Sequence, residues 1–109
     1  MNKTVLHIEG NSFQDEVVRS KLPVVVDFYA DWCGPCRIIA PMMEQFAKEY
    51  SGKVKFVKIN TDDNQELASQ FGIMSIPTVM FFLNGKVNDI VVGAVPGAVF
   101  KQKLESLTK

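Results

Sequence analysis

Short apolar runs rich in β-branched and aromatic residues alternate along the chain with segments in which apolar residues recur every three or four positions. The first pattern predicts strands, and the second predicts amphipathic helices. One run, Val24–Tyr29, is almost continuously apolar, which is typical of a strand covered on both faces. The predicted strands are Val5–Ile8, Val24–Tyr29, Val54–Asn60, Thr78–Leu83 and Lys86–Val92.

Helical spacing predicts four helices. Ser12 is expected to cap the first, in which Phe13, Val17 and Val18 form an apolar stripe. Pro41 falls inside the second and is expected to kink it. The second, third and fourth helices are expected from about Cys36 to Tyr50, from the capping candidates at 61–64 to Phe71, and from about Pro96 to Leu107.

The last two predicted strands flank Asn84-Gly85, a dipeptide typical of a tight hairpin. A hairpin joins antiparallel strands, whereas a crossover helix joins parallel ones. The order of elements therefore predicts an α/β protein with a single mixed five-stranded sheet flanked by four helices, which cover both faces. No linker or repeat interrupts the sequence, so residues 1–109 are expected to form one domain.

The composition of the chain excludes several classes of function. Apolar residues make up 47% of the 109 residues, which is enough for a buried core. Lys and Arg number 12, as do Asp and Glu, so there is no net charge and no basic surface for nucleic acid is expected. No apolar run approaches the roughly 18 residues of a membrane span, and no signal-peptide pattern opens the chain. We expect a soluble, cytoplasmic protein without membrane contact.

The two cysteines of the chain lie just after the strand Val24–Tyr29, in the motif Trp32-Cys33-Gly34-Pro35-Cys36. This places a thiol pair at a strand-to-helix junction, where the positive end of a helix favours a thiolate. Two cysteines at this spacing can also close a disulfide, although so short a loop stabilises the fold by only about 2 kcal/mol. The motif therefore predicts a redox switch rather than a structural staple.

Other uses of the cysteine pair have less support. A structural zinc site needs four ligands, and His7 is the single histidine of the chain. Haem attachment requires a histidine directly after the second cysteine, and Arg37 stands there. A Cys–His nucleophile pair would also depend on His7, which is interpreted as a strand residue without a catalytic role. No metal site is expected.

Asp27 interrupts the apolar strand Val24–Tyr29. If its carboxyl group is buried, desolvation raises its pKa. A carboxylate that reaches solvent near the strand end is an equally good interpretation of the sequence. Lys58, in the strand Val54–Asn60, is interpreted from the sequence alone as an ordinary solvated lysine.

The cysteine motif after the second strand, together with Ile76-Pro77-Thr78 before the fourth, resembles the thioredoxin family. The resemblance extends over essentially the whole chain and includes Asp27, Pro41, Lys58, Asn84-Gly85 and Gly93. It implies a thioredoxin fold. It also implies that Cys33 attacks a substrate disulfide, as the more exposed cysteine at the helix start, and that Cys36, one turn deeper, resolves the mixed disulfide. Gly34 lets the turn close, and Pro35 suits the first turn of a helix.

The resemblance also assigns roles to residues outside the motif. It implies that Asp27 exchanges a proton with Cys36 through water and that Lys58 approaches Asp27 and tunes its ionisation. It implies a cis peptide bond before Pro77, which leaves the Ile76 backbone free to pair with an extended substrate. Gly93 lacks a side chain and would let that substrate approach.

A flat apolar rim around the cysteines is expected to bind substrates. For Trp32 the alternative is an aromatic side chain packed in the core. Two departures from the family affect this surface and leave the redox centre intact: Tyr29 stands where many members have a second tryptophan, and Met74-Ser75 stands where charged or small residues are common. The rim consists of Trp32, Gly34, Pro35, Ile76, Gly93 and Ala94.

The implied function is that of a protein-disulfide reductase. Such a protein binds no cofactor, because the disulfide and dithiol of Cys33 and Cys36 carry the electrons. Its partners are thioredoxin reductase, dependent on NADPH or ferredoxin, and disulfide-containing client proteins, and it acts as a monomer. The alternatives are an oxidase or isomerase of the same fold, a glutathione-dependent enzyme, and a binding module in which the cysteines are incidental.

Overall fold

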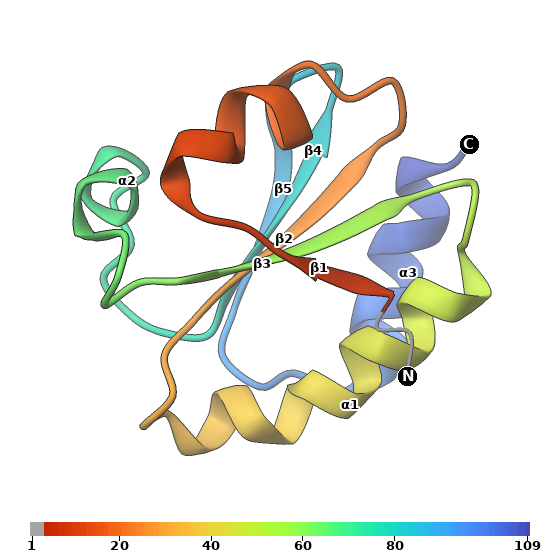
Figure 1. Cartoon of the computed structure of the whole chain (residues 1–109). Coiled ribbons are helices and arrows are strands. Elements are labelled where there is room, and N and C mark those ends of the chain that lie inside the picture. Colours follow the sequence, from red (N-terminus) through yellow and green to blue (C-terminus); the bar gives the residue numbers. More distant parts are fainter. Residues whose placement is uncertain (1–3) are drawn as a thin grey trace.

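The five predicted strands form one mixed sheet in the order β1–β3–β2–β4–β5 (Figure 1). The computed structural model describes residues 4–109, so the first three residues of the predicted domain lie outside the described part. β1 and β2 run parallel to β3, whereas β4 is antiparallel to both β2 and β5. The predicted sheet is confirmed. Its strands are β1 (Val5–His7), β2 (Val24–Tyr29), β3 (Lys55–Asn60), β4 (Thr78–Leu83) and β5 (Lys86–Val92).

Helices cover both faces of the sheet, as the order of elements predicts (Figure 1). The longest, α1 (Gly34–Glu49), packs with α3 (Gly97–Leu107) on one face. The N-terminal helical segment and the short α2 (Gln65–Gln70) pack on the other. α1 continues through Pro41, where the kink stays a prediction.

The N-terminal segment differs in kind from the predicted capped α-helix. It consists of a 3₁₀ turn, η1 (Gly10–Ser12), and a π-helical turn, η2 (Gln14–Val18), and Ser12 does not cap either. The Gly10 N–H donates to the Asn64 side chain at 2.6 Å, which fixes the start of the segment from across the fold. At the start of the segment, a tertiary contact is therefore present where a local cap was expected.

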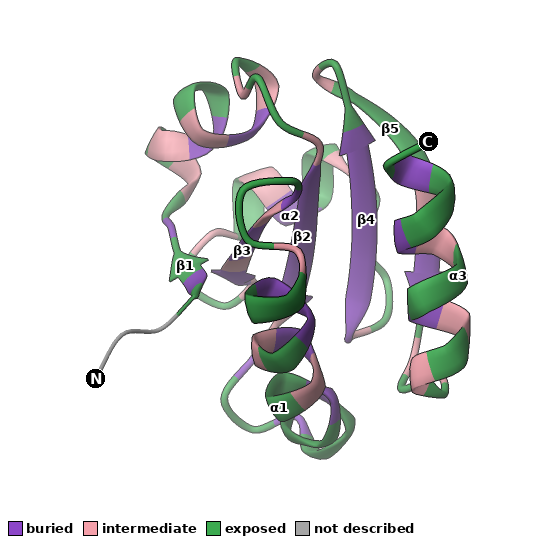
Figure 2. Ribbon diagram, turned by 90° about the vertical axis from the view of Figure 1, so that its right-hand side faces the viewer, coloured by how far each residue is buried: buried purple, intermediate pink, exposed green. Residues whose placement is uncertain are grey.

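The alternation of side chains along the central strands gives two core layers. Val25 points into the layer under α1 and α3, whereas Val24, Val26 and Phe28 point into the opposite layer. Figure 2 shows β2 and β4 as almost wholly buried ribbons between the helices. The prediction that Val24–Tyr29 is covered on both faces is therefore confirmed.

Gly85 in the β4–β5 hairpin gives a first testable prediction. It has a φ of +80°, and a Cβ there would lie 2.8 Å from the backbone oxygen of Val18. Gly85→Ala is therefore expected to lower the free energy of unfolding by about 2–3 kcal/mol in urea titrations. Gly52→Ala is the matched control, because Gly52 has a φ of +83° but open space around it, and a loss of only about 1 kcal/mol is expected. Equal losses would contradict the proposed clash with Val18.

Candidate active site

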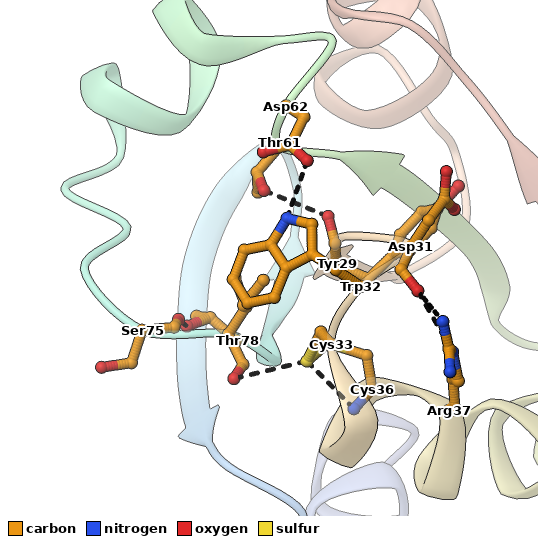
Figure 3. Close-up of a disulfide and its surroundings, with 11 residues drawn as sticks. Tyr29, Asp31, Trp32, Cys33, Cys36, Arg37, Thr61, Asp62, Ser75 and Thr78 are labelled. Carbon is orange, nitrogen blue, oxygen red and sulfur yellow. Dashed lines mark hydrogen bonds between the residues drawn. A yellow bond between two sulfur atoms is a disulfide. The ribbon is translucent and has the colours of Figure 1, made fainter.

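The cysteine pair lies where the chain leaves β2 and enters α1. Cys33 is the N-cap of α1, and its sulfur accepts the Cys36 backbone N–H at 3.2 Å (Figure 3). A disulfide joins the two residues, whose Cα atoms are 5.3 Å apart. α1 begins at Gly34, two residues earlier than predicted, because Cys33 supplies the cap and Pro35 occupies the first turn. The predicted placement of the sulfurs at a helix N-terminus is confirmed.

The prediction that Cys33 is the more exposed cysteine is wrong for this disulfide form. Cys33 is 3% exposed and Cys36 is 4% exposed. Both pack against Ala30, with Tyr29 and Ile76 at the edge of the cluster. What distinguishes Cys33 is the N–H bond that its sulfur accepts at the helix start, because such a bond stabilises negative charge on sulfur.

The loop before β4 lies against the cysteine pair. The Ile76 carbonyl oxygen is 3.8 Å from Cys33 Sγ, and the Ile76–Pro77 peptide bond is cis, as the resemblance implies. The Thr78 hydroxyl donates to the Ser75 carbonyl oxygen at 2.5 Å, and the Gly93 N–H donates to the Pro77 carbonyl oxygen at 2.8 Å. These bonds hold the loop and the end of β5 together beside the sulfurs.

Trp32 is 68% exposed, so the alternative of a packed core aromatic is wrong. Its indole N–H donates to Asp62 Oδ2 at 2.9 Å (Figure 3), which holds the ring beside the cysteine motif. Of the other predicted rim residues, Gly34, Pro35 and Ala94 are exposed, while Ile76 and Gly93 are half-buried.

Sequence reasoning missed two residues that shape this loop. Asp62 follows β3, and Arg37 donates through Nε and Nη2 to the Asp31 carbonyl oxygen, at 3.1 and 2.5 Å (Figure 3). The contact of Asp62 with Trp32 has one possible signal. β2 and β3 are parallel neighbours, so Trp32, which follows β2, and Asp62, which follows β3, lie at the same edge of the sheet. Nothing in the sequence indicated the contact of Arg37.

Asp27 is buried, so the alternative of a carboxylate that reaches solvent is wrong. Desolvation raises its pKa to about 7, against a smaller lowering by the positive charge of Lys58. Asp27 pairs with Lys58 in the register of β2 and β3, which places both side chains on one face of the sheet. Among residues 4–109, Asp27 Oδ1 has no hydrogen-bond partner.

A cavity of about 160 Å³ is lined by both Asp27 and Cys36. It is larger than the roughly 30 Å³ that one water molecule occupies in the liquid, so it has room for several. Its rim carries charged groups, and Lys58 Nζ lies 5.6 Å from the centre of the Tyr29 ring. Burial raises the pKa of Tyr29, and the negative charge of Asp31 raises it further, so its hydroxyl stays neutral. The lining includes Asp27, Tyr29, Asp31, Cys36, Arg37 and Lys58.

His7 lies in β1 and pairs with Glu9, whose Oε2 is 3.4 Å from its Nε2. Within the described residues, no group of three or more His, Cys, Asp or Glu side chains is arranged to hold a metal ion. Over the same residues, no helix has the length and apolar character required to cross a bilayer.

Comparison with known proteins agrees with this geometry. The family model described as Thioredoxin matches residues 4–106. A protein of Synechocystis sp. named Thioredoxin is 54% identical over 98 residues, covering 90% of this chain and 92% of its own length. Thioredoxin 1 of Nostoc sp. is 52% identical with the same coverage. Thioredoxin M-type, chloroplastic, of Pisum sativum is 51% identical over 90% of this chain, which spans 57% of that protein.

Proposed function

The chain belongs to the thioredoxin family, and from this premise we propose that it is a dithiol carrier that reduces client protein disulfides and is itself reduced by a partner reductase. It is a thiol–disulfide oxidoreductase that uses its own cysteine pair instead of a bound cofactor. One observation carries the proposal: the sulfur of a disulfide-forming cysteine caps the N-terminus of α1 and accepts the Cys36 N–H.

The exchange proceeds in two balanced steps. The Cys33 thiolate attacks one sulfur of the client disulfide, so a Cys33–client bond forms and the second client sulfur leaves as a thiolate that takes up a proton. The Cys36 thiol then loses its proton and attacks Cys33 Sγ, so the Cys33–client bond breaks and the first client sulfur leaves as a thiolate that takes up a proton. Two electrons pass to the client, and Cys33 and Cys36 end as the disulfide seen in the structure.

Asp27 is proposed to accept the proton that Cys36 loses. Its pKa of about 7 suits a group that gains and loses a proton near neutrality. The cavity lined by Asp27 and Cys36 offers a path for that proton through water. Lys58 supports this role, because its positive charge keeps the pKa of Asp27 from rising further.

The surface around the disulfide is proposed to dock clients. Trp32, Ile76, Gly93 and Ala94 would contact the client chain, and the Ile76 carbonyl oxygen beside Cys33 is placed to pair with an extended segment. Gly34, Pro35 and Pro77 are proposed to shape that surface. A monomeric state and a cytoplasmic location complete the proposal.

Insulin disulfide reduction tests the function. The protein is expected to catalyse the reaction at micromolar concentration when coupled in turn to an NADPH-dependent and a ferredoxin-dependent reductase, and the reductase that sustains turnover is the partner class. The double variant Cys33→Ser/Cys36→Ser is the matched control and is expected to be inactive. No insulin reduction with chemically reduced protein would contradict the proposed function.

Other measurements separate the alternatives. A reduction potential well above those of reducing dithiols would favour an oxidase or isomerase, and turnover that requires glutathione would favour a glutathione-dependent enzyme. Binding of a partner that persists in the double serine variant would favour a binding module.

A further inference from the structure

An apolar groove lies between the loop that follows α2 and the outer strand β5. Its volume is about 230 Å³, and none of its lining residues carries a charged side chain. Pockets that enclose whole small-molecule ligands are larger, roughly 300–1,000 Å³, so this groove suits one or two apolar side chains. We call it the Met74 groove; its lining includes Phe71, Ile73, Met74, Met80, Ile90 and Val92.

The helices leave this side of β5 uncovered. On the opposite side of the strand, Val91 is buried with the residues of α3, whereas Ile90 is 47% exposed. Met74, at the other wall of the groove, is 94% exposed. Contiguous exposed apolar surface marks an interaction site, and a methionine adapts its shape to varied partners. The apolar, uncharged lining therefore favours an apolar side chain as the occupant.

The groove continues from the redox centre. Met74 lies two residues before Ile76, whose carbonyl oxygen is 3.8 Å from Cys33 Sγ. Two residues of extended chain span at most about 7 Å. On the other wall, Val92 precedes Gly93, which is hydrogen-bonded to Pro77. A protein disulfide that reaches Cys33 therefore brings the residues beside its own cysteine within reach of the Met74 groove.

We infer that the Met74 groove binds an apolar side chain located two or three residues from the client cysteine that reacts with Cys33. An extended chain rises about 3.3 Å per residue, so this spacing covers the distance from Ile76 to the groove. The inference rests on the proposed function and names a substrate class: protein disulfides flanked by leucine-like residues at that spacing.

Two disulfide-linked peptide dimers test it. They are identical except for leucine or serine at the positions two and three residues from the cysteine, on both sides. The reduced protein is mixed with each peptide, and the second-order rate constants are compared in a single turnover without a reductase. The leucine peptide is expected to react about tenfold faster, which is the discrimination available from burying one apolar side chain.

Three variants show whether the groove carries this selectivity. Ile90→Asp and Met74→Glu each place a charge in the groove, and the Met74 site is nearly fully exposed. In both variants, the ratio of the rate constant for the leucine peptide to that for the serine peptide is expected to fall towards one. Val87→Asp is the matched control, since Val87 is 40% exposed, lies on β5 and does not line the groove; it is expected to keep the ratio. The ratio is taken within one variant, so a general loss of activity cancels.

The outcomes separate this inference from the proposed function. Failure to reduce either peptide would overturn the proposed function. Equal rates with both peptides in the unchanged protein would overturn the groove inference alone. The inference would also be overturned if Ile90→Asp and Met74→Glu kept the native ratio, or if Val87→Asp lost it to the same extent.

Discussion

Cys36→Ser is expected to hold the protein as a stable mixed disulfide with its client, and Cys33→Ser is expected to prevent that complex from forming. Cys33 caps α1 and accepts the Cys36 N–H at 3.2 Å, so its thiolate is the one that the helix N-terminus stabilises. Loss of either cysteine is expected to lower the rate of insulin reduction at least about 1,000-fold, because neither step can replace the other. Intact-mass spectrometry of each variant incubated with oxidised insulin detects the adduct.

The two variants control for one another, because each retains one thiol in the same motif. A covalent adduct in Cys36→Ser that dithiothreitol releases, together with none in Cys33→Ser, would confirm the assignment of attacking and resolving cysteines. Adducts through Cys36 alone would reverse it. Cys33 is buried in the disulfide form and Ile76 packs beside it. The client sulfur therefore has to approach Cys33 next to Ile76.

Local patterns in the sequence were sufficient to predict the five strands and the mixed character of the sheet. The continuous apolar run of β2 required cover on both faces, and the hairpin dipeptide made β5 antiparallel to β4. Because only two residues separate the end of β2 from the cysteine motif, the position of the sulfurs at the start of α1 followed from the order of the elements. These predictions depend on residues close together in the chain.

Features that depend on distant contacts could not be predicted from local patterns. The hydrogen bond from Gly10 to Asn64, which holds the start of the N-terminal segment, joins residues far apart in the chain. Cys33 packs against Ile76, which lies in the loop before β4, far from Cys33 in the sequence. The Met74 groove likewise requires two separate segments, so Met74 and Ile90 look unrelated in the sequence.

The environment of Asp27 could be predicted only in part from the sequence. Its place within an apolar strand raised the possibility of a buried carboxyl group, but the neighbouring strand was needed to decide between burial and exposure. Register with Lys58, and a cavity that also contacts Cys36, turn a buried acid into a candidate for proton transfer. The same burial has a consequence for stability.

Asp27→Asn is expected to stabilise the oxidised protein at high pH and not at low pH. The pKa of Asp27 rises from 3.8 to about 7 on folding, so between these values the folded state binds a proton that the unfolded state has released. The contribution of Asp27 to the stability of the native protein therefore falls as the pH rises from about 4 to about 7 and is level above that range. A shift of this size is worth on the order of 4 kcal/mol, and the uncharged amide of the variant removes the ionisation that causes the loss.

Urea unfolding of the native protein and of Asp27→Asn between pH 4 and pH 9 measures the effect. The difference in unfolding free energy is expected to grow with pH in favour of the variant and to level off above pH 7, since the other carboxyl groups titrate alike in both proteins and cancel. A difference independent of pH would contradict a buried carboxyl group with a raised pKa.

The reaction rate is expected to move in the opposite direction. Asp27→Asn and Asp27→Ala cannot accept the Cys36 proton, so resolution of the mixed disulfide is expected to slow by about 10²-fold near neutrality, while attack by Cys33 is spared. Stopped-flow measurement of the two steps separates them, with the change in fluorescence of Trp32, the one tryptophan of the chain, as the signal. A variant that gains stability above pH 7 but resolves the mixed disulfide at the native rate across neutral pH would leave Asp27 a buried acid without a role in proton transfer. Gain of stability together with loss of the resolving step would tie both effects to the same buried carboxyl group.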